Sequence, residues 1–315
     1  MASTVAVIRP MLMLTKTSFD SVLPCIRGAL LCGDRRGMNE VLGYCLRLPG
    51  RAAGAAVADP ADFWFRATEK LCESWERRKP ACTYQLDPGW RGRLHERLQL
   101  SLPCFACSEF QSVWSDVCSE LAAAGLRVGP QTFGPWNDGD AALVHAIWCL
   151  VRRMRPENVV ETGVAHGLTS RFVLEAMERN GSGHLWSIDL PPTNRELQAH
   201  VGMAVGDRLR GRWSYIRGSS RRQLPPLLQR LGWVDLFIHD SLHSKRNVLF
   251  EMNNVWSALR RGGAMVIDDI DANWGFRTFT RCLDERSWLV CEAEPERPDD
   301  RRFNGKGLFG IVLKS

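Results

Sequence analysis

Three aspartates follow two apolar runs of this sequence, at the points where predicted strands end. Asp240 closes the run 234–238, and Asp268 and Asp269 close the run 264–267. If the two runs are neighbouring parallel strands, all three carboxylates face one crevice, because parallel strands end at the same edge of a sheet. Carboxylates held that close either share protons or bind a cation. Each aspartate taken singly could instead be a helix cap, and that alternative stays open.

A histidine close to these acids suggests what a bound cation would do. A hydroxyl group is a poor nucleophile at neutral pH, but a cation lowers its pKa and a nearby imidazole can take its proton. His243 lies three residues after Asp240, and an unperturbed histidine titrates near physiological pH. We therefore expect His243 and Asp240 to be catalytic. His239 should face the other side of its strand and pack against a helix rather than bind a metal.

A glycine-bearing turn upstream predicts a second part of the site. Gly163 and Gly167 separate an apolar strand from a helix that begins at residue 168, so free helix amides and close backbone approach are available to a ligand. The G-x-x-x-G spacing lacks the third glycine of a dinucleotide site. Asp189 closes the next strand, where an acid binds ribose hydroxyls in doubly wound folds. Alternatively, the glycines only allow a sharp turn and Asp189 caps the following loop.

The elements that must position these residues alternate between helix and strand after residue 137. That alternation predicts an α/β fold with a doubly wound, mostly parallel, seven-stranded sheet. The last two strands lack a helix between them and should form an antiparallel pair at the sheet edge. The expected strands cover 158–161, 184–189, 213–217, 234–238, 264–267, 288–293 and 307–313, and the expected helices 140–154, 168–180, 195–209, 221–231, 245–259 and 276–283.

The preceding part of the chain shows helical patterns and little strand signal. We expect an N-terminal helical region over 1–125 and the α/β domain over 126–315, with helices over 18–31, 39–46, 60–77, 90–98 and 109–124. Cys104 and Cys107 form a CxxC pair in this region. A zinc or redox site would need further cysteines or histidines at ligand spacing, and none is close in the sequence, so we expect no metal there.

Composition limits the partners. The 315 residues include 45% hydrophobic and 24% charged residues, and the formal charge is only +6 with arginines spread along the chain. Neither a nucleic-acid partner nor a membrane span is expected. Eleven cysteines without a signal peptide favour reduced thiols in the cytoplasm. A homo-oligomer is compatible with the sequence, which does not specify it.

Taken in order, the motifs resemble those of class I S-adenosylmethionine-dependent methyltransferases over about residues 137–315. The similarity concerns above all the catechol O-methyltransferase-like group and the related family that methylates macrolide sugars. The motifs are Glu161-Thr-Gly-Val-Ala-His-Gly167, Ser187-Ile-Asp189-Leu, Gly218-Ser-Ser220, Asp235-Leu-Phe-Ile-His-Asp240, and Gly262-Gly263 before Val266-Ile-Asp268-Asp269.

The resemblance implies S-adenosylmethionine as cofactor, with roles for residues of the glycine turn and of the two following strand ends. These residues are Gly163 and Gly167 for the methionine part, Glu161 and Thr169 near its amino and carboxylate groups, Asp189 for the ribose hydroxyls, and Ser219 and Ser220 in the adenine-contacting loop.

The resemblance also implies a divalent cation, which we expect to be magnesium, held by Asp240, Asp268 and Asp269. The catechol group has an asparagine at the last of these positions, so the site here is more acidic. At the position of His243 the catechol enzymes carry a lysine, whereas the sugar-methylating relatives carry a histidine. This difference favours an alcohol or sugar hydroxyl over a catechol.

The predicted function is metal-assisted O-methylation of a hydroxyl on a small molecule or sugar. Two alternatives stay open: an oxidoreductase or hydroxylase on the same fold, and a non-catalytic binding protein. The missing third glycine argues against NAD, and an oxygen-rich cluster argues against the two-histidine sites typical of iron.

Overall fold

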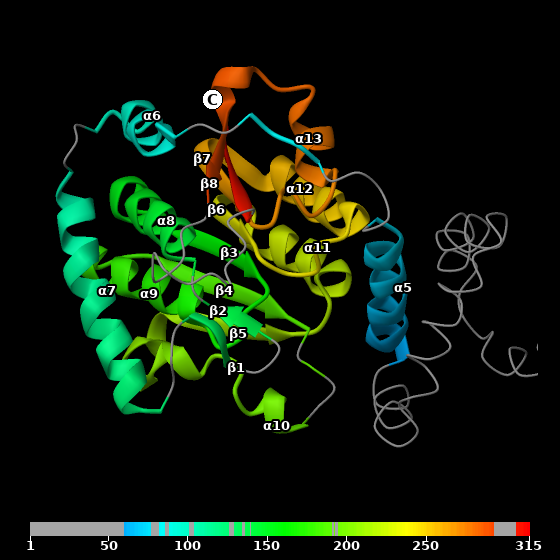
Figure 1. Cartoon of the computed structure of the whole chain (residues 1–315), viewed down its shortest axis with the longest axis horizontal. Helices are drawn as coiled ribbons and strands as arrows, with labels where there is room; N and C mark the ends of the chain where they lie inside the picture. The colour runs from blue at the N-terminus through cyan, green and yellow to red at the C-terminus, as the bar shows by residue number, and fades with distance from the viewer. Residues whose placement is uncertain are drawn as a thin grey trace, which may run out of the picture. The chain divides into compact units, whose positions relative to one another are not determined.

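The fold is taken from a computed structural model of the chain (Figure 1). The chain divides into two compact units, Met1–Trp75 and Glu76–Ser315. The structure describes residues 60–76, 82–85, 88–100, 104–125, 129–133, 136–138, 140–190, 192, 195–292 and 307–315. The helices expected over 18–31 and 39–46 lie outside these residues.

Seven strands of the described chain form one sheet in the order β5-β4-β3-β6-β7-β9-β8. The first five in this order are parallel, and β9 runs antiparallel to both β7 and β8. The doubly wound, mostly parallel, seven-stranded sheet is confirmed, with β8 rather than the last strand at the edge. The strands are β3 (Asn158–Thr162), β4 (His184–Asp189), β5 (Trp213–Arg217), β6 (Val234–His239), β7 (Leu259–Ile267), β8 (Trp288–Glu292) and β9 (Leu308–Leu313).

Helices cover both faces of the sheet, and successive strand residues alternate between them. Val159 belongs to a buried cluster with α8 and α9, whereas Val160 belongs to a second cluster with α11 and α12. This is why the strands read as continuous apolar runs. The helices are α8 (Ala141–Met154) and α9 (Leu168–Asn180) on one face, and α11 (Ser220–Leu231), α12 (Lys245–Ala258) and α13 (Gly275–Thr280) on the other.

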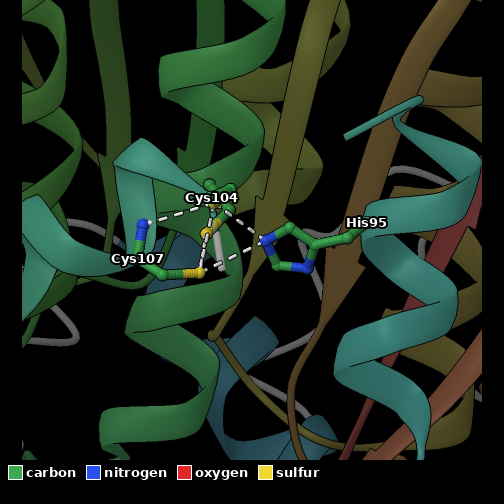
Figure 2. A group of neighbouring side chains, drawn as sticks. His95, Cys104 and Cys107 are labelled. Carbon is green, nitrogen blue, oxygen red and sulfur yellow. Dashed lines mark hydrogen bonds between the residues drawn. The ribbon is translucent and has the colours of Figure 1, made fainter. Parts of the chain in front are cut away.

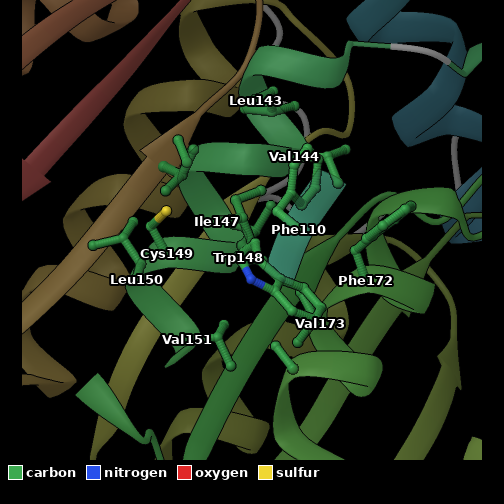
Figure 3. Packing of buried hydrophobic residues seen from close by; sticks show 14 of the residues in the cluster. Phe110, Leu143, Val144, Ile147, Trp148, Cys149, Leu150, Val151, Phe172 and Val173 are labelled. Carbon is green, nitrogen blue, oxygen red and sulfur yellow. The ribbon is translucent and has the colours of Figure 1, made fainter. Parts of the chain in front are cut away.

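Two further helices, α6 (Trp90–Arg97) and α7 (Phe105–Ala123), belong to the same compact unit as the sheet. Phe110 of α7 packs against Trp148 of α8 and Phe172 of α9, with ring centroids 6.1 and 5.6 Å away (Figure 3). The Trp148 indole N–H donates to the Ala106 carbonyl at 2.9 Å. The boundary expected after residue 125 therefore falls inside this unit. Helix α5 (Pro60–Glu76) lies almost wholly in the other unit.

The helix expected over 195–209 is wrong. Only α10 (Arg195–Gln198) is α-helical, and two short 3₁₀ segments follow, Met203–Val205 and Asp207–Arg212. Gly202 and Gly206 interrupt the helix with φ angles of +71° and +70°, which only glycine adopts without strain.

A short hairpin was missed: β1 (Gly129–Phe133) pairs antiparallel with β2 (Trp136–Asp138). Asp140 then caps α8 by accepting hydrogen bonds from the Ala142 and Leu143 amides. None of the described helices is long and apolar enough to cross a bilayer.

The shared core predicts that α7 is essential to the sheet unit. Phe110→Ala removes a side chain that is only 3% exposed and should lower the free energy of unfolding by about 3–5 kcal/mol. Urea unfolding followed by tryptophan fluorescence measures this loss. The matched control is Phe105→Ala on the same helix, where the side chain is 74% exposed and the change should stay within about 0.5 kcal/mol. Equal stability of the two variants would contradict a common core.

Candidate active site

The two strands that precede the acidic residues are parallel neighbours, as expected. In the β6–β7 ladder His239 lies opposite Ile267, so Asp240 and Asp268 are the next residues on each strand. The Asp268 amide donates to the His239 carbonyl at 3.0 Å, which continues the ladder past the strand ends. The acids therefore emerge side by side at the carboxyl edge of the sheet.

The carboxylates and the histidine converge on one point. His243 Nε2 lies 3.9 Å from Asp240 Oδ1 and 3.9 Å from Asp269 Oδ2. One ligand atom each from Asp240, His243 and Asp268 fall within 4.8 Å of one another. Burial, and then the negative charges of Asp269, Asp240 and Asp140, raise the pKa of Asp268 well above its usual value. A half-buried set of like charges with oxygen donors fits a hard divalent cation, and His243 is close enough to contribute a nitrogen.

The backbone of Asp269 explains part of this convergence. Its φ angle is +50°, in the left-handed region that aspartate and asparagine enter more readily than other side chains. The Asp269 carbonyl accepts from the Ala272 amide at 3.0 Å, so the chain turns sharply after β7. This turn favours aspartate, asparagine or glycine at residue 269, independently of any metal.

The glycine turn lies directly beside the acids. Gly163 has a φ angle of +87°, and a Cβ atom there would lie 1.8 Å from the Asp240 carbonyl oxygen. The Gly163 amide donates to the Ile188 carbonyl at 2.9 Å. At Gly167 (φ +83°), a Cβ atom would lie 3.0 Å from the Gly202 Cα. Both glycines thus let neighbouring backbone approach, and their predicted contacts with a cofactor stay predictions.

Asp189 ends β4 next to this turn. Its Oδ1 accepts from the Val164 amide at 3.2 Å, and its Oδ2 accepts from the Tyr215 hydroxyl at 3.3 Å. Burial, followed by the charge of Asp189, raises the pKa of Tyr215, which keeps the phenol protonated as a donor. The half-buried carboxylate is oriented at the mouth of the turn.

Glu161 was expected near the amino and carboxylate groups of the cofactor, but its side chain is hydrogen-bonded within the protein. It is 1% exposed, and its Oε2 accepts hydrogen bonds from the Ser170 and Ser187 hydroxyls, both at 2.6 Å. The carboxylate thus ties β3 to β4 and to the first turn of α9. This geometry favours a role in positioning the turn, and direct contact with a cofactor remains untested.

The remaining predicted cofactor residues border the same strand ends. Thr169 is half-buried in the first turn of α9. Ser219 is buried at the N-terminus of α11, and Ser220 donates to Asn247 Oδ1 at 3.4 Å. The Gly218 amide donates to the Asp189 carbonyl at 2.8 Å, which holds this loop against the end of β4.

A buried pair of a carboxylate and an imidazole behind the acids was not foreseen. As expected, His239 faces a helix, and its Nδ1 lies 2.6 Å from Glu251 Oε2 of α12. Glu251 also accepts from Thr162, Ser241 and Asn247. Burial alone would raise the pKa of Glu251, but the His239 imidazole and hydrogen bonds from Ser220 and Thr162 lower it to about 2.

Two asparagines hold the loop that carries His243. Asn247 Nδ2 donates to the Leu242 carbonyl at 3.0 Å, and Asn273 Nδ2 donates to the His243 carbonyl at 2.9 Å. Neither asparagine was predicted from the sequence to belong to the site, and neither was Glu251. A signal existed, because Asn247 and Glu251 stand four residues apart on the face of α12 that also buries Val248 and Met252. Polar residues on a buried helix face require partners.

Comparison with known proteins agrees with this fold. Residues 160–270 match the family model described as a methyltransferase domain, and this segment contains the glycine turn and all three acids. No curated protein sequence matches the chain significantly.

Several solved structures are similar in fold at low sequence identity. An O-methyltransferase described as putative, from Klebsiella pneumoniae, has 15% identity and a TM-score of 0.42, over 71% of this chain and 96% of that one. The O-methyltransferase TomG from Streptomyces achromogenes, in complex with S-adenosylmethionine, has 17% identity and a TM-score of 0.43, over 73% and 100%. A Bacillus cereus O-methyltransferase has 16% identity and a TM-score of 0.42, over 64% and 91%.

The segment 160–270 is similar to a methyltransferase domain, and it carries the glycine turn after β3. The predicted resemblance to methyltransferases is confirmed at this level.

The low pKa of Glu251 predicts how stability depends on pH. Its stabilising effect is fully present above the pKa of an unfolded glutamate, about 4.5, and is lost as the pH falls toward 2. Glu251→Gln should therefore cost about 3 kcal/mol at pH 7, and the difference from wild type should shrink below about pH 4.5. Urea unfolding of both proteins between about pH 3 and about pH 7 measures this difference in the free energy of unfolding.

The matched control is Glu178→Gln, which removes an exposed ion pair with Arg212 and should cost at most about 1 kcal/mol at any pH. A Glu251→Gln penalty that is independent of pH would show that the pair is not ionised.

Proposed function

We propose that this chain transfers a methyl group from S-adenosylmethionine to a hydroxyl of a small molecule or sugar, assisted by a divalent cation. The observation that supports this most strongly is the convergence of Asp240, Asp268, Asp269 and His243 beside the glycine turn. A methyl donor at the turn and an acceptor at the acids would then be neighbours, because Gly163 touches the Asp240 backbone.

The cofactor would lie across the ends of β3, β4 and β5. The first turn of α9 offers amides that no side-chain cap occupies, which suit the carboxylate of the methionine part. Asp189 suits the ribose hydroxyls, and the Ser219–Ser220 loop, held against β4, borders the adenine position. Bound there, the cofactor supplies an electrophilic methyl group.

The metal would lie among oxygen donors from two strand ends. Asp240, Asp268 and Asp269 would hold it, and the donor set fits magnesium or manganese better than zinc. Bound there, the cation lowers the pKa of the acceptor hydroxyl.

His243 would accept the hydroxyl proton at Nε2. This nitrogen lies 3.9 Å from Asp240 Oδ1 and 3.9 Å from Asp269 Oδ2, beside the proposed position of the hydroxyl, and in this role it is not a metal ligand. Asn273 and Asn247 fix the loop backbone around His243, so the base is held in position before a substrate arrives.

Binding of the cofactor tests the first half of this proposal. Calorimetry should detect S-adenosylmethionine or its demethylated product, and Asp189→Ala should weaken binding about 10- to 100-fold, because charged hydrogen bonds to the ribose are lost. Asp207→Ala, at an exposed aspartate that pairs only with Arg210 among the contacts described, should leave affinity unchanged. Absence of binding at millimolar concentration would refute the methyltransferase activity.

Transfer itself is tested with S-adenosylmethionine labelled in its methyl group, magnesium and a library of hydroxylated metabolites. The expected product carries the label on an oxygen. Products labelled only on nitrogen or carbon would contradict the proposed acceptor class.

Metal binding is tested without a known substrate. Manganese, titrated calorimetrically at neutral pH, should bind the wild-type chain, and Asp268→Asn should weaken binding at least about tenfold, because a central carboxylate loses its charge. Asp284→Asn, at an exposed aspartate that pairs with Arg286, is the control. Manganese affinity that is unaffected by Asp268→Asn would remove these acids from the metal site, while leaving cofactor binding to be judged separately.

A further inference from the structure

The CxxC pair has partners that its sequence neighbourhood does not reveal. Cys104 caps the N-terminus of α7 and Cys107 lies in the first turn of that helix, while His95 reaches them from the last turn of α6 (Figure 2). His95 Nε2 is 3.1 Å from Cys104 Sγ and 3.3 Å from Cys107 Sγ, and the two sulfurs are 3.2 Å apart. The expectation that no histidine is available to this pair is therefore wrong.

A third cysteine completes the cluster from α8. Cys149 Sγ lies 3.8 Å from Cys107 Sγ, and one ligand atom from each of the four residues falls within 4.8 Å of the others. Zinc bonds of about 2.3 Å to sulfur and about 2.0 Å to nitrogen, in a tetrahedron, place sulfurs about 3.8 Å apart and nitrogen about 3.6 Å from sulfur. The four separations given above lie within about 0.6 Å of that arrangement.

We propose that His95, Cys104, Cys107 and Cys149 bind one zinc ion as a structural Cys₃His site.

The orientation of His95 supports a ligand role. Its Nδ1 lies 2.7 Å from the Arg91 carbonyl oxygen, which can only accept, so Nδ1 carries the proton. In this tautomer the lone pair of Nε2 points toward the sulfurs. Metal-binding histidines are commonly held in this way by a carbonyl on the other ring nitrogen.

Enclosure indicates a structural rather than a redox role. The exposed fractions are 3% for His95, 7% for Cys104 and 1% for Cys149, and Cys107 is half-buried. A redox CxxC pair must admit a reactant, and a catalytic zinc must keep one position open, whereas structural sites are closed by four protein ligands. Three sulfurs and one imidazole close the tetrahedron.

His145 is a second histidine beside the pair, and it interacts with the Cys107 side chain. It lies one helical turn before Cys149, and its ring stacks on Phe110 with centroids 4.5 Å apart and an interplanar angle of 13°. The proposal assigns the ligand nitrogen to His95, and a variant of His145 tests that choice.

The site is separate from the acidic crevice and would connect three helices. Cys149 stands nine residues after Asp140, which is about 13 Å along α8. The metal would join α8 to α6 and α7, and α6 in turn contacts the sheet edge through Arg97, whose Nη1 donates to the Trp288 carbonyl at 2.8 Å.

The wild-type chain provides the first test. Full-length protein is purified with a thiol reductant, exposed to zinc, desalted, and analysed for metal content and by X-ray absorption at the zinc edge. The expected result is one zinc per chain with three sulfurs and one nitrogen in its first shell. Absence of zinc would overturn the proposal. A first shell of oxygen and nitrogen alone would also overturn it, because the ion would then be bound elsewhere, for example among the aspartates.

Variants then test the assignment of ligands. Cys149→Ser and His95→Gln should each lose the bound zinc or a sulfur or nitrogen from its shell, and lower the melting temperature. His145→Gln and Cys118→Ser, the latter on α7 itself, should keep one zinc with the wild-type shell. Loss of zinc in His145→Gln together with an unchanged shell in His95→Gln would overturn the assignment.

A redox pair predicts a different outcome. In that case the reduced protein binds no zinc, and peptide mapping of protein kept without reductant finds a Cys104–Cys107 disulfide; this result would also overturn the proposal. Because the wild-type spectra do not require any variant to fold, the test holds even if Cys149→Ser is insoluble.

Discussion

The site depends on one constraint: β3, β6 and β7 end at the same position along the sheet, at Thr162, His239 and Ile267. The Asp240 amide donates to the Thr162 carbonyl and the Asp268 amide to the His239 carbonyl, so the parallel ladder continues past the strands. The Asp240 carbonyl oxygen also occupies the space where a side chain at residue 163 would begin, 1.8 Å from its Cβ position. Only glycine at 163 lets β6 end at this height. A shift of either strand by one residue would turn its terminal carboxylate to the opposite face.

Charge is distributed unequally on the two sides of the loop that follows β6. Behind it, Glu251 is fully buried yet ionised, because His239 and several hydrogen-bond donors surround its carboxylate. In front of it, burial and the negative charges of Asp269 and Asp240 raise the pKa of Asp268. The hydrogen bonds to Glu251 hold the loop from behind, and the proposed cation would reduce the repulsion between the acids in front. Rigid support behind a charged crevice limits the reorganisation that binding would otherwise require.

Local patterns were sufficient to predict most of the fold. Apolar runs bounded by glycine and aspartate indicate buried parallel strands. The adjacency of β6 and β7 agrees with the tendency of successive strands joined by one helix to be neighbours. The helix expected over 195–209 failed for a local reason: Gly202 and Gly206 adopt positive φ angles, and glycine permits such angles without requiring them. The hairpin over 129–138 has too little alternation to be recognised.

The parts that escaped prediction depend on contacts between residues distant in sequence. The role of Glu251 depends on the packing of α12 against β6, which brings its carboxylate to His239. In the same way, Cys149 reaches Cys107 only when α7 and α8 are packed together, although 42 residues separate the two.

The acidic cluster at the strand ends and the cysteine–histidine cluster between the helices nevertheless differ in the ligands that they offer. The crevice offers carboxylate oxygens, which suit hard cations, and the helix cluster offers thiolates, which suit zinc. Because α8 begins at Asp140 near the acids and carries Cys149 about 13 Å further on, one nearly wholly buried helix links both clusters. An ion bound between α6, α7 and α8 would fix the position of this helix and thereby the height of Asp140 beside the crevice. Soft ligands far from the crevice would allow zinc to stabilise the domain without competing for the carboxylates.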